Sequence, residues 1–261
     1  MKLCLLRLLC AALLLPAAIY SQAPAPGKNT PVIRGQKQEV LLYPATGGSG
    51  APKGKVLFVS GSGGMHRFSV TMARTMASWG YEVYGLDAKH YLKSFTGDTT
   101  LRETEIMGDF RELAGWINQG AKDPITLVGY SQGAGLCLLG AVPEENKKQF
   151  NGLVCICLPE ASVLGWRWID NIFDLLKKNP HEPEFLSKNF LDKISPTPFV
   201  MIQSRQDEWV TLEQSEQMFA LAKAPKRTLV IEAQNHSFKN NRDDFFNELQ
   251  KGLQWINTPS P

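Results

Sequence analysis

The sequence is poor in the residues that build disulfide frameworks and metal sites. Of five cysteines in 261 residues, only Cys137, Cys155 and Cys157 follow the first 23 residues. An odd number argues against a disulfide framework, so we expect free thiols that pack as small hydrophobic groups. Cys155 and Cys157 stand two apart in an apolar run typical of a strand, which predicts that both point to one face of a sheet. The four histidines lack metal-ligand spacing such as His-Glu-x-x-His, so no metal or other cofactor is expected.

Charge of one sign is also scarce. The chain has 28 Lys and Arg residues against 25 Asp and Glu residues, and no stretch in which basic residues cluster. Because a nucleic-acid surface needs such a cluster, nucleic-acid binding is not expected. The glycine-rich turn at residues 60–64 lacks the Gly-Lys-Ser/Thr of a phosphate-binding loop, which argues against nucleotide binding as well.

The chain lacks an apolar run of about 20 residues, the length that a membrane-spanning helix requires. Its start instead has Lys2 and Arg7 ahead of a shorter apolar stretch, residues 8–19, which Pro16 interrupts. This pattern is typical of a secretory signal peptide, predicted here over residues 1–23. Its removal lowers the formal net charge from +3 to +1, because it holds two basic and no acidic groups. We therefore expect a secreted or periplasmic mature protein.

Strand and helix patterns alternate through most of the chain. Residues 24–31 are rich in proline and predict a flexible leader, and residues 32–258 predict one domain. Short continuous apolar runs, such as residues 55–60 and 125–129, are typical of strands buried on both faces of a parallel sheet. Amphipathic helical segments separate them. The alternation predicts an α/β fold, with a mainly parallel twisted sheet and helices on both of its faces.

One segment does not fit this alternation. Residues 160–195 are too long for a single connection and carry Trp166, Trp168, Phe173 and Phe185. Two interpretations stay open at this point. The segment is either a crossover helix packed on the core or a small cap that shapes a substrate pocket.

The pentapeptide at residues 129–133, Gly-Tyr-Ser-Gln-Gly, fits the G-x-S-x-G nucleophile elbow. It stands between a predicted strand that ends at Gly129 and a predicted helix that begins at Gln132. A sharp turn between the two would hold the serine in a strained conformation and expose its hydroxyl, provided that glycines flank it. Ser131 is therefore the candidate nucleophile, and Tyr130 beside it is a candidate for substrate contact.

A serine hydroxyl needs a base and an orienting carboxylate, which follow it in the chain order Ser, Asp or Glu, His in the fold that uses this elbow. Asp207 comes just after the predicted strand at residues 199–203, and Glu208 is its neighbouring competitor. His236 lies in a loop after the next strand. We predict a triad of Ser131, Asp207 and His236.

The oxyanion of an acyl-transfer intermediate needs backbone N–H donors. One is expected from Gln132, the residue after the nucleophile, and the other from the glycine-rich turn that follows an early strand. There we expect the N–H of Ser62, with Gly63 as the alternative. Gly61, Gly63 and His66 are further candidates for substrate contact.

These stretches resemble the α/β-hydrolase superfamily and, within it, the bacterial virulence protein VirJ-like family. The resemblance is carried by residues 59–64, the segment around residues 87–95 and residues 129–134. It implies an α/β-hydrolase fold with periplasmic export. It also implies an ester hydrolase of the cell envelope, acting on aminoacylated phospholipids such as lysyl-phosphatidylglycerol, or an association with secretion-system partners. In that family an acidic residue often stands at the position of Ser62.

The residues and the resemblance together predict a serine hydrolase that cleaves a carboxylic ester through an acyl-enzyme. Its partner would be a small-molecule or lipid ester, with peripheral membrane contact left open. Two alternatives remain at this point. One is an envelope binding or assembly protein of the VirJ type with a vestigial triad, and the other is a thioesterase or peptidase that uses the same triad.

Overall fold

A computed structural model describes residues 22–46, 50–167, 169, 172 and 182–258. All of the predicted signal peptide except its last two residues lies outside this range, as do Trp168 and Phe173 of the 160–195 segment. Among the described residues, no helix is long and apolar enough to cross a membrane.

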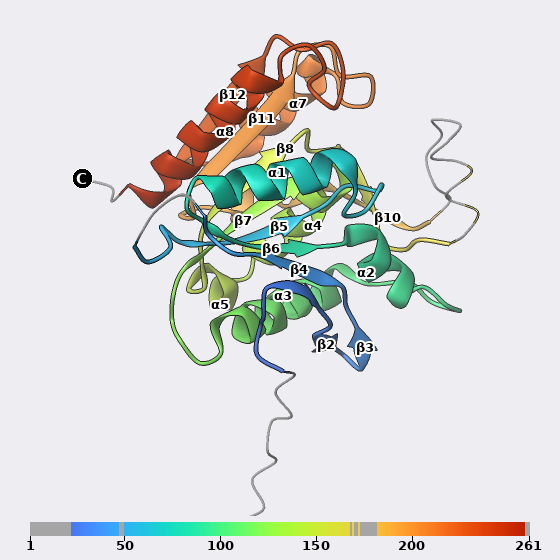
Figure 1. Cartoon of the computed structure of the whole chain (residues 1–261). Coiled ribbons are helices and arrows are strands. Elements are labelled where there is room, and N and C mark those ends of the chain that lie inside the picture. Colours follow the sequence, from blue (N-terminus) through green and yellow to red (C-terminus); the bar gives the residue numbers. More distant parts are fainter. Residues whose placement is uncertain (1–21, 47–49, 168, 170–171, 173–181, 259–261) are drawn as a thin grey trace, which may run out of the picture.

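The centre of the molecule is an eight-stranded sheet (Figure 1). The two strand pairs at one edge are antiparallel, and all other neighbouring strands of this sheet are parallel. The prediction of a mainly parallel α/β sheet is confirmed. The strands in their order across the sheet are β1 (Gly27–Asn29), β4 (Val40–Tyr43), β6 (Glu82–Leu86), β5 (Lys55–Val59), β7 (Ile125–Tyr130), β8 (Phe150–Ile156), β11 (Phe199–Ser204) and β12 (Lys226–Ile231).

Helices cover both faces of this sheet (Figure 1). The helices α1 (Arg67–Ser78) and α8 (Arg242–Asn257) pack on one face and touch each other. The opposite face carries α3 (Glu103–Asn118) and α4 (Gln132–Ala141), with α5 (Glu144–Lys147) beside them and α7 (Leu212–Leu221) against β11. The short α2 (Ala88–Ser94) follows β6. This arrangement confirms helices on both faces.

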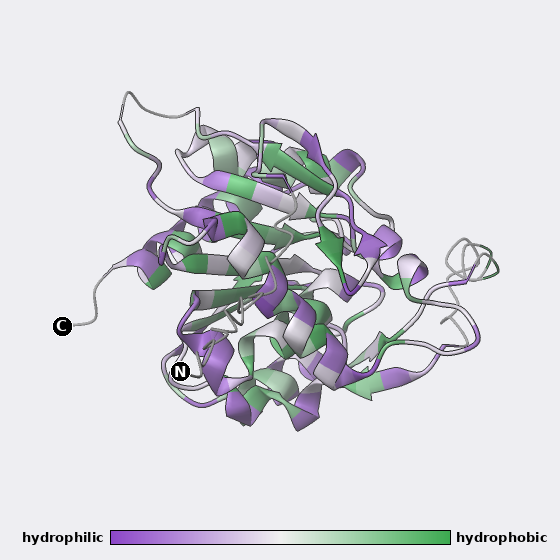
Figure 2. Ribbon diagram, turned by 90° about the horizontal axis from the view of Figure 1, so that it is seen from below, coloured by the Kyte–Doolittle hydropathy of each residue, from purple (hydrophilic) through white to green (hydrophobic). Residues whose placement is uncertain are grey.

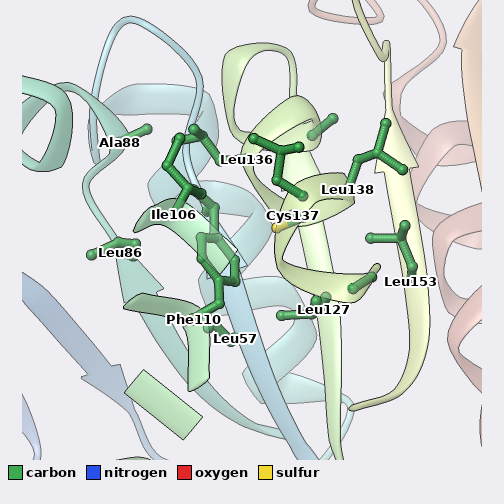
Figure 3. Close-up of a cluster of buried hydrophobic side chains, with 14 of the residues drawn as sticks. Leu57, Leu86, Ala88, Ile106, Phe110, Leu127, Leu136, Cys137, Leu138 and Leu153 are labelled. Carbon is green, nitrogen blue, oxygen red and sulfur yellow. The ribbon is translucent and has the colours of Figure 1, made fainter. Parts of the chain in front are cut away.

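The apolar side chains form two clusters, one on each face of the sheet. Figure 2 shows the strands as mainly hydrophobic and the outer helices as banded with hydrophilic residues, the pattern that burial of one helix stripe produces. In Figure 3, Phe110 of α3 lies beside Leu57 of the sheet, and Leu127 belongs to the same cluster. Burying such a ring contributes about 1.5–3 kcal/mol to the stability of the fold. The two clusters thereby fix the strands after which the site residues follow.

The three cysteines are buried and free, as predicted. Cys137 and Cys155 belong to the cluster under α3 and α4, whereas Cys157 belongs to the cluster under α1 and α8. The prediction that Cys155 and Cys157 share a face is therefore wrong. The reason is that β8 ends at Ile156 and Cys157 has a left-handed backbone, with φ +50°, which breaks the strand's alternation.

The predicted leader contains regular structure. Gly27–Asn29 form β1 and pair with β4 at the edge of the sheet, with Asn29 opposite Val40. The prediction of a flexible segment is wrong for these residues, because the free edge of β4 offers partners to their backbone groups. A small hairpin follows, made by β2 (Val32–Ile33) and β3 (Gln36–Lys37).

Part of the 160–195 segment lies against α4. Its described portion holds the antiparallel pair β9 (Ala161–Val163) and β10 (Glu184–Leu186), followed by the short 3₁₀ turns η1 (Ser187–Asn189) and η2 (Leu191–Lys193). A Cβ at Gly135 of α4 would overlap the hydroxyl of Ser162, so the strand β9 sits directly on the helix that follows Ser131.

Candidate active site

Ser131 stands at the junction of β7 and α4. Its backbone has φ +54° and ψ −124°, a region that non-glycine residues rarely adopt and that costs about 1–3 kcal/mol. The N–H of Ser131 donates to the carbonyl of Ile156 at 2.8 Å, which ties the turn to β8. Although Ser131 occupies the N-cap position, its side chain makes no capping hydrogen bond to α4. Its hydroxyl is thus not engaged by the helix that it begins.

The two glycines of the motif are required by close packing. A Cβ at Gly129 would overlap the backbone of Gly133 and Ala134, and a Cβ at Gly133 would overlap the carbonyl oxygens of Val59 and Ser60. The turn can therefore approach β5 only if both positions lack a side chain. This contact brings Ser131 beside the turn at residues 60–64.

Asp207 lies in the loop after β11 with its carboxylate fully buried. It accepts a hydrogen bond from Nδ1 of His236 at 2.7 Å and one from the side-chain amide of Gln203 at 3.2 Å. The backbone N–H groups of Trp209 and Val210 donate to its other oxygen at 2.8 and 3.0 Å. Both carboxylate oxygens are satisfied, which holds the group in one orientation.

These contacts also set the protonation of Asp207. Burial alone would raise the pKa of its carboxyl group, but the hydrogen bond and electrostatic attraction of His236 lower it, as do the N–H groups of Trp209 and Val210. The contacts outweigh burial, so the pKa of Asp207 lies below its ordinary value. At neutral pH the group is a carboxylate that can orient an imidazole.

His236 is held from several sides. The ring of Tyr130 lies with its centre 5.2 Å from that of the imidazole, and the Tyr130 hydroxyl donates to the His236 carbonyl at 3.2 Å. Glu208, the competitor for the role of acid, accepts from the backbone N–H of His236 at 2.8 Å instead. Because Asp207 engages Nδ1, Nε2 is the nitrogen left for proton transfer.

Ser131 and His236 line the same two hollows of the surface. The first, with a volume of about 340 Å³, also includes Ser62 and Gln132. The second has a volume of about 900 Å³ and includes Gly61, Ser62, Gly63, His66 and Tyr130. The structure thus brings every residue predicted for the oxyanion hole and for substrate contact to one of these two hollows beside Ser131.

Asp87 is a positioning residue that the sequence analysis did not single out. One of its carboxylate oxygens accepts from the N–H of Met65 at 2.8 Å and the other from the N–H of His90 at 2.8 Å. It packs so closely on Gly64, which has φ +76°, that a Cβ there would lie 2.6 Å from a carboxylate oxygen. Asp87 therefore anchors the end of the glycine-rich turn. Its position directly after β6 was the available signal.

Cys157, Asp207 and His236 offer three donor atoms within 4.8 Å of one another, a spacing that could suit a metal ion. The chemistry of these donors argues otherwise. Nδ1 of His236 already donates to Asp207, and burial together with the negative charge of Asp207 raises the pKa of the Cys157 thiol well above its ordinary value. A protonated thiol is a poor ligand, so the cluster fits a hydrogen-bonded acid and base better than a metal centre.

Residues 54–163 match the family model of the bacterial virulence protein VirJ. The matched part includes Ser62 and Ser131 and ends before Asp207 and His236. The uncharacterized protein YfhR of Escherichia coli is 28% identical over 69 residues, which are 26% of this chain and 24% of that protein. The chain thus spans about a quarter of the length of the curated relative that it matches.

Solved structures resemble the chain over most of its length. An α/β serine hydrolase without a lid from Xanthomonas campestris is 16% identical with a TM-score of 0.61, covering 92% of this chain and all of that one. A membrane phospholipase A, called a bacterial virulence factor, is 16% identical with a TM-score of 0.65, covering 89% of this chain and 87% of that one. At such identities the likeness shows the fold alone. The chain has the α/β-hydrolase fold, and the predicted VirJ-like resemblance is confirmed.

Proposed function

We propose that this chain is an exported serine hydrolase that cleaves a carboxylic ester with Ser131, His236 and Asp207. One observation carries the proposal. The imidazole of His236, bound to Asp207 at 2.7 Å, lines the same hollow as Ser131, whose backbone is strained at φ +54°. A serine, a histidine and a buried carboxylate in this order are the groups that acyl transfer uses.

The reaction follows from the roles of these groups. The Ser131 oxygen attacks the ester carbon while Nε2 of His236 takes the hydroxyl proton, and the carbonyl oxygen becomes an oxyanion. The N–H groups of Gln132 and Ser62 are the proposed donors to that oxyanion. The C–O bond to the alcohol then breaks, and His236 returns the proton to the departing alcohol oxygen. Water, deprotonated by His236, then attacks the acyl carbon of the acyl-enzyme. The C–O bond to Ser131 breaks, His236 returns the proton to the Ser131 oxygen, and the acid is released.

The first hollow has room for an acyl group of modest length, and its wall is part apolar and part polar. Its wall includes the apolar side chains of Val163, Trp166, Trp209 and Val210. A volume of about 340 Å³ stands at the lower end of small-molecule sites. The substrate class is a small-molecule or lipid ester. A lipid ester is supported by the structural likeness to a membrane phospholipase A and by the VirJ-like resemblance. Hydrolysis of such a substrate would bring the protein into peripheral contact with a membrane.

A second candidate function is binding or assembly at the cell envelope with a vestigial triad. The observation in its favour is that the VirJ match covers residues 54–163 and so contains neither Asp207 nor His236. The complete hydrogen bonding of Asp207 argues for the enzyme, because nothing in binding requires a buried carboxylate on an imidazole.

A panel of three substrates that differ only in the scissile bond tests the proposal. We expect the purified mature protein to hydrolyse an oxygen ester faster than the matched thioester and amide, and Ser131→Ala to abolish turnover. The chain would instead be a thioesterase or peptidase if wild type preferred the thioester or the amide and a folded Ser131→Ala variant lost that turnover. No turnover of any substrate by folded wild type would favour the binding protein.

Export is a separate part of the proposal. It rests on the basic start, apolar stretch and small residues within residues 1–23. The intact mass of the protein recovered from the periplasm of an expressing bacterium should lack about 21–23 N-terminal residues, as this signal pattern predicts. A protein of full-length mass confined to the cytoplasm would contradict it.

A further inference from the structure

The second hollow beside Ser131 differs in charge from the first. Both hollows include Ser62, Ser131 and His236, so they meet at the proposed reaction centre. The wall of the first includes the carboxylates of Glu160 and Glu184. The residues that line the second include two arginines, Arg67 and Arg242, and no Asp or Glu residue.

The two arginines come from different helices. Arg67 is the first residue of α1 and Arg242 the first residue of α8, and these helices pack against each other. Within the described part of the chain, neither guanidinium forms an ion pair with a carboxylate. Arg242 also lines a third hollow together with the neighbouring Asp243, which is absent from the wall of the second. The wall of the second hollow therefore carries two exposed arginines with which no carboxylate of the described residues pairs.

Arg242 is oriented by groups of the site itself. Its guanidinium carbon lies 4.7 Å from the centre of the Phe68 ring, a cation–π contact, and its Nε donates to the carbonyl of Ser237 at 3.3 Å. Ser237 follows His236 in the chain, and Phe68 follows Arg67. The backbone of Arg67 has φ +41°, an unfavourable conformation at the rim of this hollow. The contacts of Arg242 hold its guanidinium beside Phe68 and Ser237, which line the second hollow with it.

We propose that the second hollow is an anion subsite in which Arg67 and Arg242 bind a carboxylate or phosphate group of the ester substrate. The inference rests on the proposed hydrolase function, because it places the anion on a molecule whose ester group lies at Ser131. Guanidinium groups bind such anions through paired N–H donors. The substrate is thus an ester that carries negative charge on one side of its scissile bond.

Binding and turnover of three aryl esters test this subsite. The neutral probe is 4-methylphenyl butyrate, 4-carboxyphenyl butyrate carries the anion on the alcohol, and phenyl hydrogen glutarate carries it on the acyl group. A fourth arm measures competitive inhibition by inorganic phosphate, which distinguishes a phosphate site from a carboxylate site. We expect the Ser131→Ala variant to bind one anionic ester about 10-fold more tightly than the neutral ester. A hydrogen bond to a charged group changes Kd by about this factor.

The arginines are then changed one at a time. Arg67→Gln and Arg242→Gln should each reduce the preference for the anionic over the neutral probe, measured as the ratio of the two Kd values in the Ser131→Ala background and of the two kcat/KM values in the active enzyme. Arg74→Gln is the matched control, because Arg74 is an exposed arginine of α1 outside this hollow. It should leave the preference unchanged.

The two proposals fail in different ways. Equal affinity for anionic and neutral probes, or a preference that survives the double Arg67→Gln, Arg242→Gln change, would overturn the anion subsite even in an active hydrolase. Absence of turnover with a retained, arginine-dependent affinity for the anionic probe would overturn the hydrolase and keep the anion subsite.

Discussion

The side-chain amide of Gln132 is bound to both backbone groups of Val163. Its nitrogen donates to the Val163 carbonyl at 3.0 Å, and its oxygen accepts from the Val163 N–H at 3.2 Å. Both residues are buried. The residue that follows the proposed nucleophile thus holds the strand β9, which forms part of the wall of the first hollow.

We predict that Gln132→Ala lowers the free energy of unfolding by about 2–3 kcal/mol, because it removes two buried hydrogen bonds and leaves both groups of Val163 without a partner. The backbone N–H of residue 132 persists in the variant, so KM for an ester should rise more than kcat falls. Urea unfolding and steady-state kinetics measure both effects. Gln217→Ala, on the exposed face of α7, is the control. An unfolding free energy equal to that of wild type would refute this role of Gln132.

We predict that Asp207→Asn lowers kcat by about 10⁴-fold, as loss of the orienting carboxylate does in Ser-His-Asp enzymes. An asparagine amide cannot fix the imidazole tautomer that leaves Nε2 as the base. Glu208→Gln should lower kcat by roughly 10-fold at most, since Glu208 binds only the backbone N–H of His236 in the described contacts. The kcat of each variant on a chromogenic ester decides between Asp207 and Glu208 as the acid. A larger loss of kcat in Glu208→Gln than in Asp207→Asn would assign that role to Glu208.

Asp207 also predicts how stability depends on pH. Its pKa in the folded protein lies below the ordinary value of about 4 that it has in the unfolded chain. The carboxylate therefore stabilises the fold above that pH, and its contribution is lost as the pH falls through the lowered folded value. The difference in unfolding free energy between wild type and Asp207→Asn should shrink from pH 6 toward about pH 3. A difference that stays constant over this range in urea titrations would contradict the assignment.

Alanine substitutions at Gly133 and at Gly115 should change stability in opposite directions. Gly133→Ala should destabilise the protein by about 3 kcal/mol or more, because its Cβ would overlap the backbone of β5 and overpacking of rigid groups is costly. Gly115→Ala, at an open and exposed position of α3, should stabilise by about 0.5–1 kcal/mol through helix propensity. Thermal unfolding of both variants shows whether each is less or more stable than wild type. A fully stable Gly133→Ala protein would show that the turn does not need to approach β5.

Local patterns predicted the elements that carry the chemistry. The strand, turn and helix around Ser131 lie within residues 125–141, so their apolar runs and glycines could be read directly from the sequence. Asp207 and His236 were predicted because each follows a strand of a parallel sheet, whose carboxyl ends meet at one edge.

Contacts between distant residues could not be predicted in the same way. The bond from Gln132 to Val163 depends on how residues 161–163 return to α4, and no periodicity reports it. The side chain of Cys157 lies on the face opposite to Cys155 because of one positive φ after β8, which an apolar sequence does not indicate. The strand β1 exists because β4 has a free edge, a property of the assembled sheet rather than of the proline-rich segment itself.

The central claim is that His236 and Asp207 activate the hydroxyl of Ser131. Reaction of the purified protein with a fluorophosphonate probe, read by intact mass and peptide mapping, tests it most directly. The account predicts one probe per chain on Ser131 in wild type and in Ser78→Ala, which changes an exposed serine of α1, and no labelling in Ser131→Ala or His236→Ala. A folded wild-type protein that remains unlabelled, or a Ser131→Ala variant labelled to the same extent, would contradict it.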